Sequence, residues 1–164
     1  MSGFVLDLSQ LSQGSSQHRL EANASELGLA VESWPGRVVG DVLVERNGER
    51  ITIRGRLQAR GGLECVRCLR GFELPLDVPF EVFAERSRSG NRRDEEALER
   101  DDYMLFHDGR KLDLTDQARE SVLLELPIAP HCRDDCKGLC PRCGADLNEG
   151  PCGCPDRVGA DEAP

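Results

Sequence analysis

Apolar and polar residues alternate along the chain between residues 37 and 84. An alternation with a period of two predicts strands that bury one face, and the Asn-Gly pair at 47–48 is the pair that tight hairpins prefer between such strands. The Gly-Gly pair at 61–62 predicts a second turn. Pro75 and Pro79 fall on the polar face of the last run, which suggests an edge strand because proline cannot donate to a ladder. The stretch is therefore expected to form an antiparallel β-meander with one buried face.

Leu112–Leu126 is the one stretch with strong helical spacing. Apolar residues recur along it at every fourth position, namely Leu114, Ala118, Val122 and Leu126. Asp113 or Thr115 can cap its start, and the prolines at 127 and 130 end it. A short strand is expected just before the helix, at Tyr103–Phe106. These elements predict an α+β fold, with an antiparallel β-meander or partly open barrel and one main helix.

The composition limits the core and the surroundings of this fold. Apolar residues make up 38% of the 164 residues and aromatic residues 4%, so the core must be mostly aliphatic. The formal net charge is −9, which repels phosphate backbones and anionic membranes. The first residues lack a basic region followed by an apolar run, and no stretch reaches the roughly 20 apolar residues of a membrane span. We therefore expect a cytoplasmic protein that has no membrane partner, and this compartment favours reduced metal-binding cysteines over disulfides.

Six of the eight cysteines lie between residues 132 and 154, and the other two form the pair Cys65/Cys68. The run Cys-Pro-Arg-Cys-Gly at 140–144 has the form of a metal knuckle. Two thiolates three positions apart can hold one ion, and the glycine lets backbone N–H groups approach the sulfurs. One predicted site is therefore formed within a short segment by Cys140, Cys143, Cys152 and Cys154. The remaining four thiols predict a second site that joins segments distant in sequence, formed by Cys65, Cys68, Cys132 and Cys136.

Two variations on this partition stay open. Cys136 could replace a knuckle ligand, and His131 could replace Cys132, although we expect His131, His18 and His107 to lie at the surface. The predicted cofactor is Zn²⁺, one or two ions, in a structural role because four thiolates leave no open coordination position. The sequence contains no metalloprotease, P-loop, dinucleotide-binding or serine-hydrolase motif. We therefore expect a protein that is not an enzyme and has no small-molecule substrate.

These observations divide the chain into five parts. Residues 1–86 are expected to form the antiparallel β domain with the first Cys-x-x-Cys knuckle, and residues 87–102 a charged flexible loop. Residues 103–130 are expected to add a strand and a helix that pack on the β domain. Residues 131–155 form the Cys-rich zinc-binding module, and residues 156–164 a disordered tail.

A basic stripe offers a possible contact with RNA or a partner. Three arginines share the polar face of one predicted strand and two more follow just beyond it: Arg54, Arg56, Arg60, Arg67 and Arg70. Their functional interpretation is phosphate contact. The alternative is cross-strand pairing, because the neighbouring strands carry acidic residues on the same face, and ordinary sheet stabilisation accounts for such charges. We favour the pairing.

The motifs taken together resemble those of the bacterial YceD family. The resemblance rests on Glu64–Cys68, the Glu-Leu-Pro run at 125–127, Asp135–Asn148 and the closing Cys-Gly-Cys at 152–154. It implies a role in the synthesis, processing or stability of 23S ribosomal RNA and hence in large-subunit biogenesis. The implied partner is a precursor of the large-subunit rRNA or a basic ribosomal protein of the large subunit. The resemblance supplies no catalytic residues.

Two redox functions are the alternatives. Paired thiolates can release zinc on oxidation, which would make the chain a redox-responsive zinc–thiolate switch. A thioredoxin-like oxidoreductase at Cys65/Cys68 is a weaker alternative, because that pair follows a Gly-Gly run in β-patterned sequence instead of opening a helix.

Overall fold

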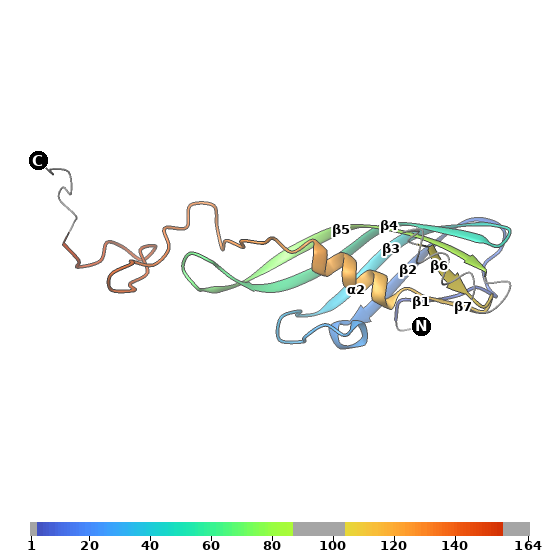
Figure 1. Cartoon of the computed structure of the whole chain (residues 1–164), viewed down its shortest axis with the longest axis horizontal. Coiled ribbons are helices and arrows are strands. Elements are labelled where there is room, and N and C mark those ends of the chain that lie inside the picture. Colours follow the sequence, from blue (N-terminus) through green and yellow to red (C-terminus); the bar gives the residue numbers. More distant parts are fainter. Residues whose placement is uncertain (1–2, 87–103, 156–164) are drawn as a thin grey trace, which may run out of the picture. The chain divides into compact units, whose positions relative to one another are not determined.

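The computed structural model describes residues 3–86 and 104–155 (Figure 1). The expected loop at 87–102 and the expected tail at 156–164 lie outside these residues. The described residues form two compact units. Of the described residues, unit 1 comprises 3–62, 73–86 and 104–126, and unit 2 comprises 63–72 and 127–155. The five-part division made from the sequence stays a prediction.

The main sheet has five strands in the order β2-β3-β4-β5-β6. Their bounds are β2 Gly14–Asn23, β3 Arg37–Asn47, β4 Arg50–Glu64, β5 Gly71–Arg86 and β6 Met104–His107. The pairs β2–β3 and β3–β4 are antiparallel, and the hairpin between β3 and β4 turns at the predicted Asn-Gly pair. The pair β5–β6 is parallel. The sheet is open, which confirms the predicted α+β fold with a strand-rich core and one main helix.

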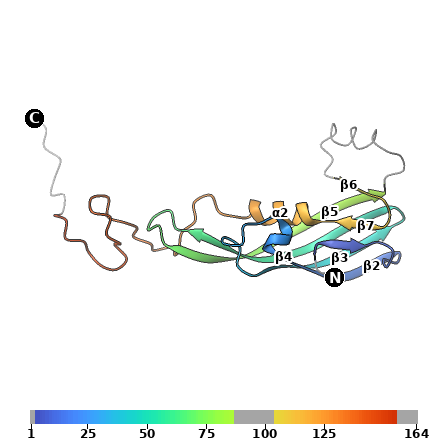
Figure 2. The same cartoon turned by 90° about the horizontal axis from the view of Figure 1, so that it is seen from below.

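One face of the sheet is covered by short elements from both ends of unit 1 (Figures 1 and 2). They are β1 (Val5–Asp7), the 3₁₀ turn η1 (Ala24–Leu27), β7 (Lys111–Asp113) and the helix α2 (Thr115–Leu124). β1 and β7 pair antiparallel as a second, two-stranded sheet. Ala118 and Val122 of α2 are fully buried in the same cluster as Ile53 and Leu57 of β4. The alternation in the sequence therefore selects the buried face, and the core is mostly aliphatic.

Three details of the predicted elements are wrong. The Gly-Gly pair at 61–62 does not turn but continues β4. Gly62 donates its N–H to the carbonyl of Ser33 at 2.6 Å, and a Cβ at Gly61 would meet the Leu126 side chain at 3.2 Å. These glycines therefore serve close approach within a strand rather than chain reversal. The helix also begins later than expected, because Leu112 pairs with Leu6 in the small sheet.

The third wrong detail concerns the last strand of the meander. β5 lies inside the strand order, but its register with β6 covers only Phe83–Arg86. Pro75 and Pro79 lie in the part of β5 before that pairing, so the edge interpretation holds for them and fails for the last residues of the strand. A parallel neighbour needs a crossover connection, which local alternation cannot indicate.

His107 is buried, so the prediction of a surface histidine is wrong. Its exposed fraction is 7%, and its Nδ1 accepts the N–H of Gly109 at 3.0 Å. The residue ends β6 opposite Arg86 of β5, a placement that follows from the parallel pairing. Burial lowers the pKa of His107 below its usual value.

Among the described residues, no helix has the length and apolar character needed to cross a membrane.

Candidate metal centres

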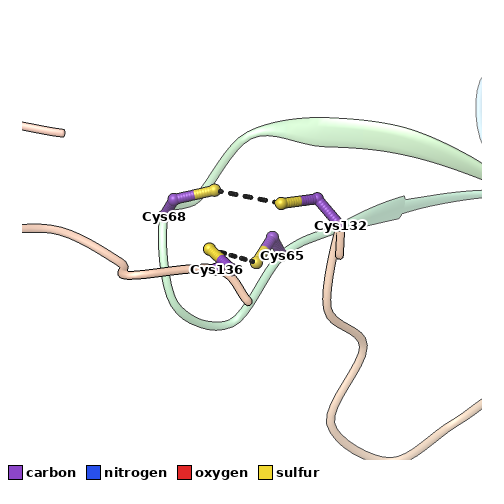
Figure 3. Close-up of side chains that lie close together, drawn as sticks. All are labelled: Cys65, Cys68, Cys132 and Cys136. Carbon is purple, nitrogen blue, oxygen red and sulfur yellow. Dashed lines mark hydrogen bonds between the residues drawn. The ribbon is translucent and has the colours of Figure 1, made fainter. Parts of the chain in front are cut away.

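Four cysteines from two distant segments meet in unit 2 and form what we term the clasp cluster: Cys65, Cys68, Cys132 and Cys136. Figure 3 shows their sulfurs pointing toward one another. The Sγ atoms of Cys65 and Cys136 are 3.8 Å apart, and those of Cys68 and Cys132 are 3.7 Å apart. Tetrahedral Zn–S bonds of about 2.3 Å place sulfurs about 3.8 Å apart. The spacing therefore fits one tetrahedral ion.

The other four cysteines form the terminal cluster: Cys140, Cys143, Cys152 and Cys154. The sulfurs of Cys140 and Cys152 are 3.4 Å apart, and all four lie within 4.8 Å of one another. Each cluster thus groups four thiols that could hold a metal ion, in the same two sets that the spacing predicts. His131 is exposed and belongs to neither group.

The backbone forms the two Cys-x-x-Cys knuckles in the same way. The N–H of Cys65 is donated to the carbonyl of Arg70 at 2.9 Å, and the N–H of Cys140 to that of Ala145 at 2.8 Å. In each knuckle the residue after the second cysteine donates its N–H back to the carbonyl of the first cysteine at 2.8 Å. That residue is Leu69 in one knuckle and Gly144 in the other. The shared pattern turns the chain tightly around the sulfurs.

Hydrogen bonds from backbone N–H groups lower the pKa of one thiol in each cluster. Burial raises the pKa of Cys65, but hydrogen bonds from the N–H groups of Cys132 and of its own knuckle outweigh burial and lower the pKa to about 6. The N–H groups of its own knuckle lower the pKa of Cys140 to about 6. Burial and the neighbouring thiols raise the pKa of Cys132 to about 12, and the Cys143 thiol raises that of Cys154 to about 12. Backbone N–H groups thus favour the thiolate form of one sulfur in each cluster, and a bound cation would favour the thiolate form of all four.

Main-chain contacts fix the two segments of the clasp cluster together. The N–H of Val66 is donated to the carbonyl of Pro130 at 2.9 Å, and that of Leu139 to the carbonyl of Arg67 at 3.1 Å. Gly138, with φ +73°, lies very close to the backbone of Arg67, since a Cβ at this position would meet the Arg67 carbonyl oxygen at 3.0 Å. The geometry of the thiols therefore depends on backbone pairing as well as on any ion.

Asn148 contacts the clasp cluster, a role that was not identified from the sequence. Its side-chain oxygen accepts the N–H of Lys137 at 2.8 Å, and its Nδ2 donates to the sulfur of Cys136 at 3.5 Å. Asp146 accepts a second bond from the same Nδ2 at 2.7 Å. Asn148 thus donates a hydrogen bond to a candidate ligand sulfur without being a candidate ligand itself. No local signal marks this role, because the contact spans twelve positions of an irregular segment.

The arginines proposed for RNA contact are all held by internal partners. On the sheet, Arg54 Nε donates to Glu81 at 2.6 Å and Arg56 Nε donates to Asp77 at 2.7 Å. Arg60 lies 3.8 Å from a carboxylate oxygen of Glu73. The three pairs join β4 and β5 on the outer face, which is the cross-strand pairing weighed against phosphate contact.

In unit 2 the remaining two arginines make contacts around the knuckles. Arg67 Nη1 donates to the carbonyl of Cys136 at 3.1 Å. Arg70 Nη2 donates to Asp146 at 2.9 Å and to Glu149 at 3.2 Å. Both guanidiniums therefore stabilise the fold of unit 2 itself.

Comparison with known proteins gives the family. The sequence profile described as "Large ribosomal RNA subunit accumulation protein YceD" matches residues 53–162, a range that includes all eight cysteines. The chain belongs to the YceD family. This confirms the resemblance seen in the sequence motifs. No solved structure matches the chain.

Several curated proteins are similar to this chain, and one of them carries the YceD name. An uncharacterized protein of Mycobacterium leprae is 33% identical over 121 residues, which are 74% of this chain and 54% of that protein. An uncharacterized protein of Mycobacterium tuberculosis is 35% identical over 112 residues, which are 68% of this chain and 52% of that protein. The chain thus spans about half the length of these curated relatives. A protein of Arabidopsis thaliana, "Large ribosomal RNA subunit accumulation protein YCED homolog 1, chloroplastic", is 40% identical over 45 residues, 27% of this chain and 14% of that protein.

Proposed function

We propose that the chain is a non-catalytic factor in the synthesis, processing or stability of 23S rRNA, and thereby in biogenesis of the large ribosomal subunit. The observation that carries the proposal is the family match over residues 53–162, whose description names large-subunit rRNA accumulation. The two four-thiol clusters support the non-catalytic part. Four sulfurs would occupy all the coordination positions of a tetrahedral ion, so neither cluster would leave a position for water or substrate.

The proposed cofactor is structural Zn²⁺ at both clusters. The clasp cluster would hold the ion with Cys65 and Cys68 on one side and Cys132 and Cys136 on the other. Because Cys68 and Cys132 are 64 positions apart, an ion here closes a long loop of chain. The terminal cluster would hold a second ion within a short segment. Zinc supplies no reaction in this arrangement; it neutralises the thiolates and fixes the knuckles.

The proposed partner is a basic ribosomal protein of the large subunit, in the cytoplasm. The formal net charge of −9 suits a basic surface, and thiolate clusters add negative charge. Direct RNA contact through the five arginines is the weaker alternative, because each already has an acidic or carbonyl partner. Reversing the charge of Arg54 and Arg56 together tests it: RNA binding that persists unchanged in the folded double variant removes this face as an RNA site.

The thioredoxin-like alternative has no structural support. Cys65 and Cys68 lie in the connection between β4 and β5, whereas an oxidoreductase pair of that type opens a helix. Each of the two sulfurs also has a neighbour from the distant segment. We propose that this pair binds metal. The redox-switch alternative concerns the terminal cluster instead, where Cys143 is exposed.

Depletion of the protein in its own cell tests the function. We expect a fall in the ratio of 23S to 16S rRNA, measured by quantitative RNA electrophoresis, and recovery when the wild-type gene is supplied. A Cys136→Ser gene should rescue poorly, because it removes a buried clasp thiol. An Arg133→Gln gene is the matched control, since it changes a nearby exposed side chain outside both clusters and should rescue fully. An unchanged rRNA ratio on depletion would contradict the proposed function.

A further inference from the structure

The two clusters differ in how far their sulfurs are shielded from water. In the clasp cluster three of the four cysteines are buried, and Cys65 has an exposed fraction of 0%. In the terminal cluster only Cys140 is buried, Cys143 is exposed, and the other two are half-buried. Oxidants reach exposed thiolates first. The structure thus contains a sheltered thiol cluster and an accessible one in the same unit.

The clusters also differ in what must move when a sulfur leaves. The clasp cluster lies between chain segments that main-chain bonds hold together, and it packs against Phe72 and Leu139. All four cysteines of the terminal cluster fall within residues 140–154. A rearrangement among these four thiols therefore stays within one short segment. The four sulfurs lie within 4.8 Å of one another, and those of Cys140 and Cys152 pair with each other at 3.4 Å. Cys154 is therefore the thiol left beside the exposed Cys143.

We propose that the terminal cluster is a site of reversible oxidation by hydroperoxides, in which Cys143 is attacked and Cys154 closes the disulfide, while the clasp cluster stays reduced. The inference deepens the proposed function, since it assigns different roles to the two proposed metal sites. The clasp cluster is permanent, and the terminal cluster can be opened and restored.

The chemistry balances with one molecule of hydroperoxide, the Cys143 thiolate and the Cys154 thiol. The Cys143 thiolate attacks the O–O bond of hydrogen peroxide, forms an S–O bond and releases hydroxide. The Cys154 thiol then attacks the sulfenic sulfur, forms the S–S bond and releases water. Two cysteines lose two electrons and the peroxide gains them. A dithiol reductant returns both thiolates by exchange through a mixed disulfide.

The disulfide would remove two of the four ligands from an ion in the terminal cluster. The two thiols left, Cys140 and Cys152, cannot complete a tetrahedral site, so the ion would be released. The bond from Cys140 N–H to the Ala145 carbonyl and the bridge between Leu139 and Asp146 do not involve the sulfurs. We expect the knuckle backbone and the clasp cluster to survive while the segment closing on Cys154 is freed.

Peroxide titration of the full-length, metal-loaded chain tests the site. Reduced thiols are alkylated at each dose, and peptides are identified by mass spectrometry while a dye reports released zinc. We expect Cys143 and Cys154 to be oxidised at least about tenfold faster than any clasp thiol, with zinc released in step and both changes reversed by dithiothreitol. Equal oxidation of the two clusters, or early oxidation that spares Cys143, overturns the proposal.

A matched pair of variants tests the assignment of the second thiol. Cys154→Ser should accumulate the sulfenic acid of Cys143, trapped by a dimedone probe, because the two thiols that remain, Cys140 and Cys152, pair with each other at 3.4 Å. Cys152→Ser removes a thiol from the same cluster but keeps Cys154, and should show little trapping. Equal trapping in the two variants removes Cys154 from this role.

The experiment separates failure of this inference from failure of the proposed function. Thiol mapping can be done whether or not the chain binds a metal. If the purified chain contains no zinc but Cys143 is still oxidised first, the proposed metal site is refuted and the oxidation site stands. Uniform protection of all eight thiols, in a chain whose depletion lowers 23S rRNA, would refute the oxidation site and keep the function.

Discussion

Leu69 and Gly144 occupy the same position in two separate knuckles. Each follows the second cysteine of its pair, each has a left-handed backbone, with φ of +58° and +74°, and each donates its N–H to the first cysteine's carbonyl at 2.8 Å. Glycine adopts this conformation without strain, whereas a leucine there costs roughly 1–2 kcal/mol. Leu69 is the one non-glycine residue with positive φ among the described residues. The clasp knuckle is therefore the more strained of the two.

Replacing Leu69 with glycine is expected to stabilise unit 2. The side chain is 57% exposed, so little packing is lost, and relief of strain should outweigh the added freedom of the unfolded chain by up to about 1 kcal/mol. Competition with a zinc chelator measures the change as tighter metal binding. Leu69→Ala is the control, because it trims the same side chain but keeps the Cβ that causes the strain. A glycine variant that binds metal more weakly than the alanine variant would contradict this account.

Gly138 and Gly144 give a second matched pair. Both have φ near +74°, but a Cβ at Gly138 would meet the Arg67 carbonyl oxygen at 3.0 Å, whereas one at Gly144 would have no neighbour within 4 Å. Gly144→Ala should cost about 1 kcal/mol from backbone strain alone. Gly138→Ala should cost more, because it also pushes apart the two segments that carry the clasp thiols. Thermal unfolding of the zinc-loaded variants gives the comparison, and equal losses would argue against the close approach.

Local patterns account for most of what the sequence predicted correctly. The period-two alternation selects the buried residues of β3 and β4, because neighbouring residues of a strand point to opposite faces. The short segment between Cys143 and Cys152 limits how four thiols can close on one ion, so the predicted and observed groupings agree. In both cases the deciding interaction is close in sequence.

Contacts between distant segments account for what the sequence did not predict. The sequence predicts a turn at Gly62, but in the structure its N–H donates to the carbonyl of Ser33. His107 reads as a surface residue until the parallel register places it opposite Arg86. Asn148 reads as a loop residue until it meets Cys136. Each role depends on a partner far along the chain, and periodicity and spacing carry no information about that partner.

His107 should make the stability of unit 1 depend on pH. Burial lowers its folded-state pKa below the unfolded value of about 6.5, so between the two values the unfolded chain binds more protons. The free energy of unfolding should therefore fall as the pH drops below about 6.5 and level off below the folded-state pKa. Arg46 and Arg86 add to the cost of the charged ring, while the Glu49 backbone and then Asp108 offset part of it.

Urea unfolding followed by Trp34 fluorescence measures this dependence. Trp34 is the single tryptophan and is buried in the core of unit 1, so the signal does not report on the thiol clusters. His107→Asn keeps an acceptor for the Gly109 N–H and removes the titrating group. It should flatten the profile between pH 7.5 and 5. A fall of the same size in the variant would assign the effect to other groups.

Removal of metal should unfold unit 2 and leave unit 1 folded. Unit 1 has its own apolar core around Ile53, Leu57 and Trp34, whereas the buried cluster of unit 2 consists mainly of cysteine side chains with Phe72 and Leu139. Structural zinc contributes on the order of 10 kcal/mol to small sites of this kind, more than such a small cluster can replace. Elemental analysis should find two ions per chain, and a strong chelator should collapse the amide signals of unit 2 while Trp34 fluorescence stays native. Cys143→Ser separates the two ions: it should lower the content to about one and keep the amide signals around Cys65, since it removes an exposed thiol from the terminal cluster only. Loss of the Trp34 signal on chelation would show instead that the core of unit 1 depends on the metal.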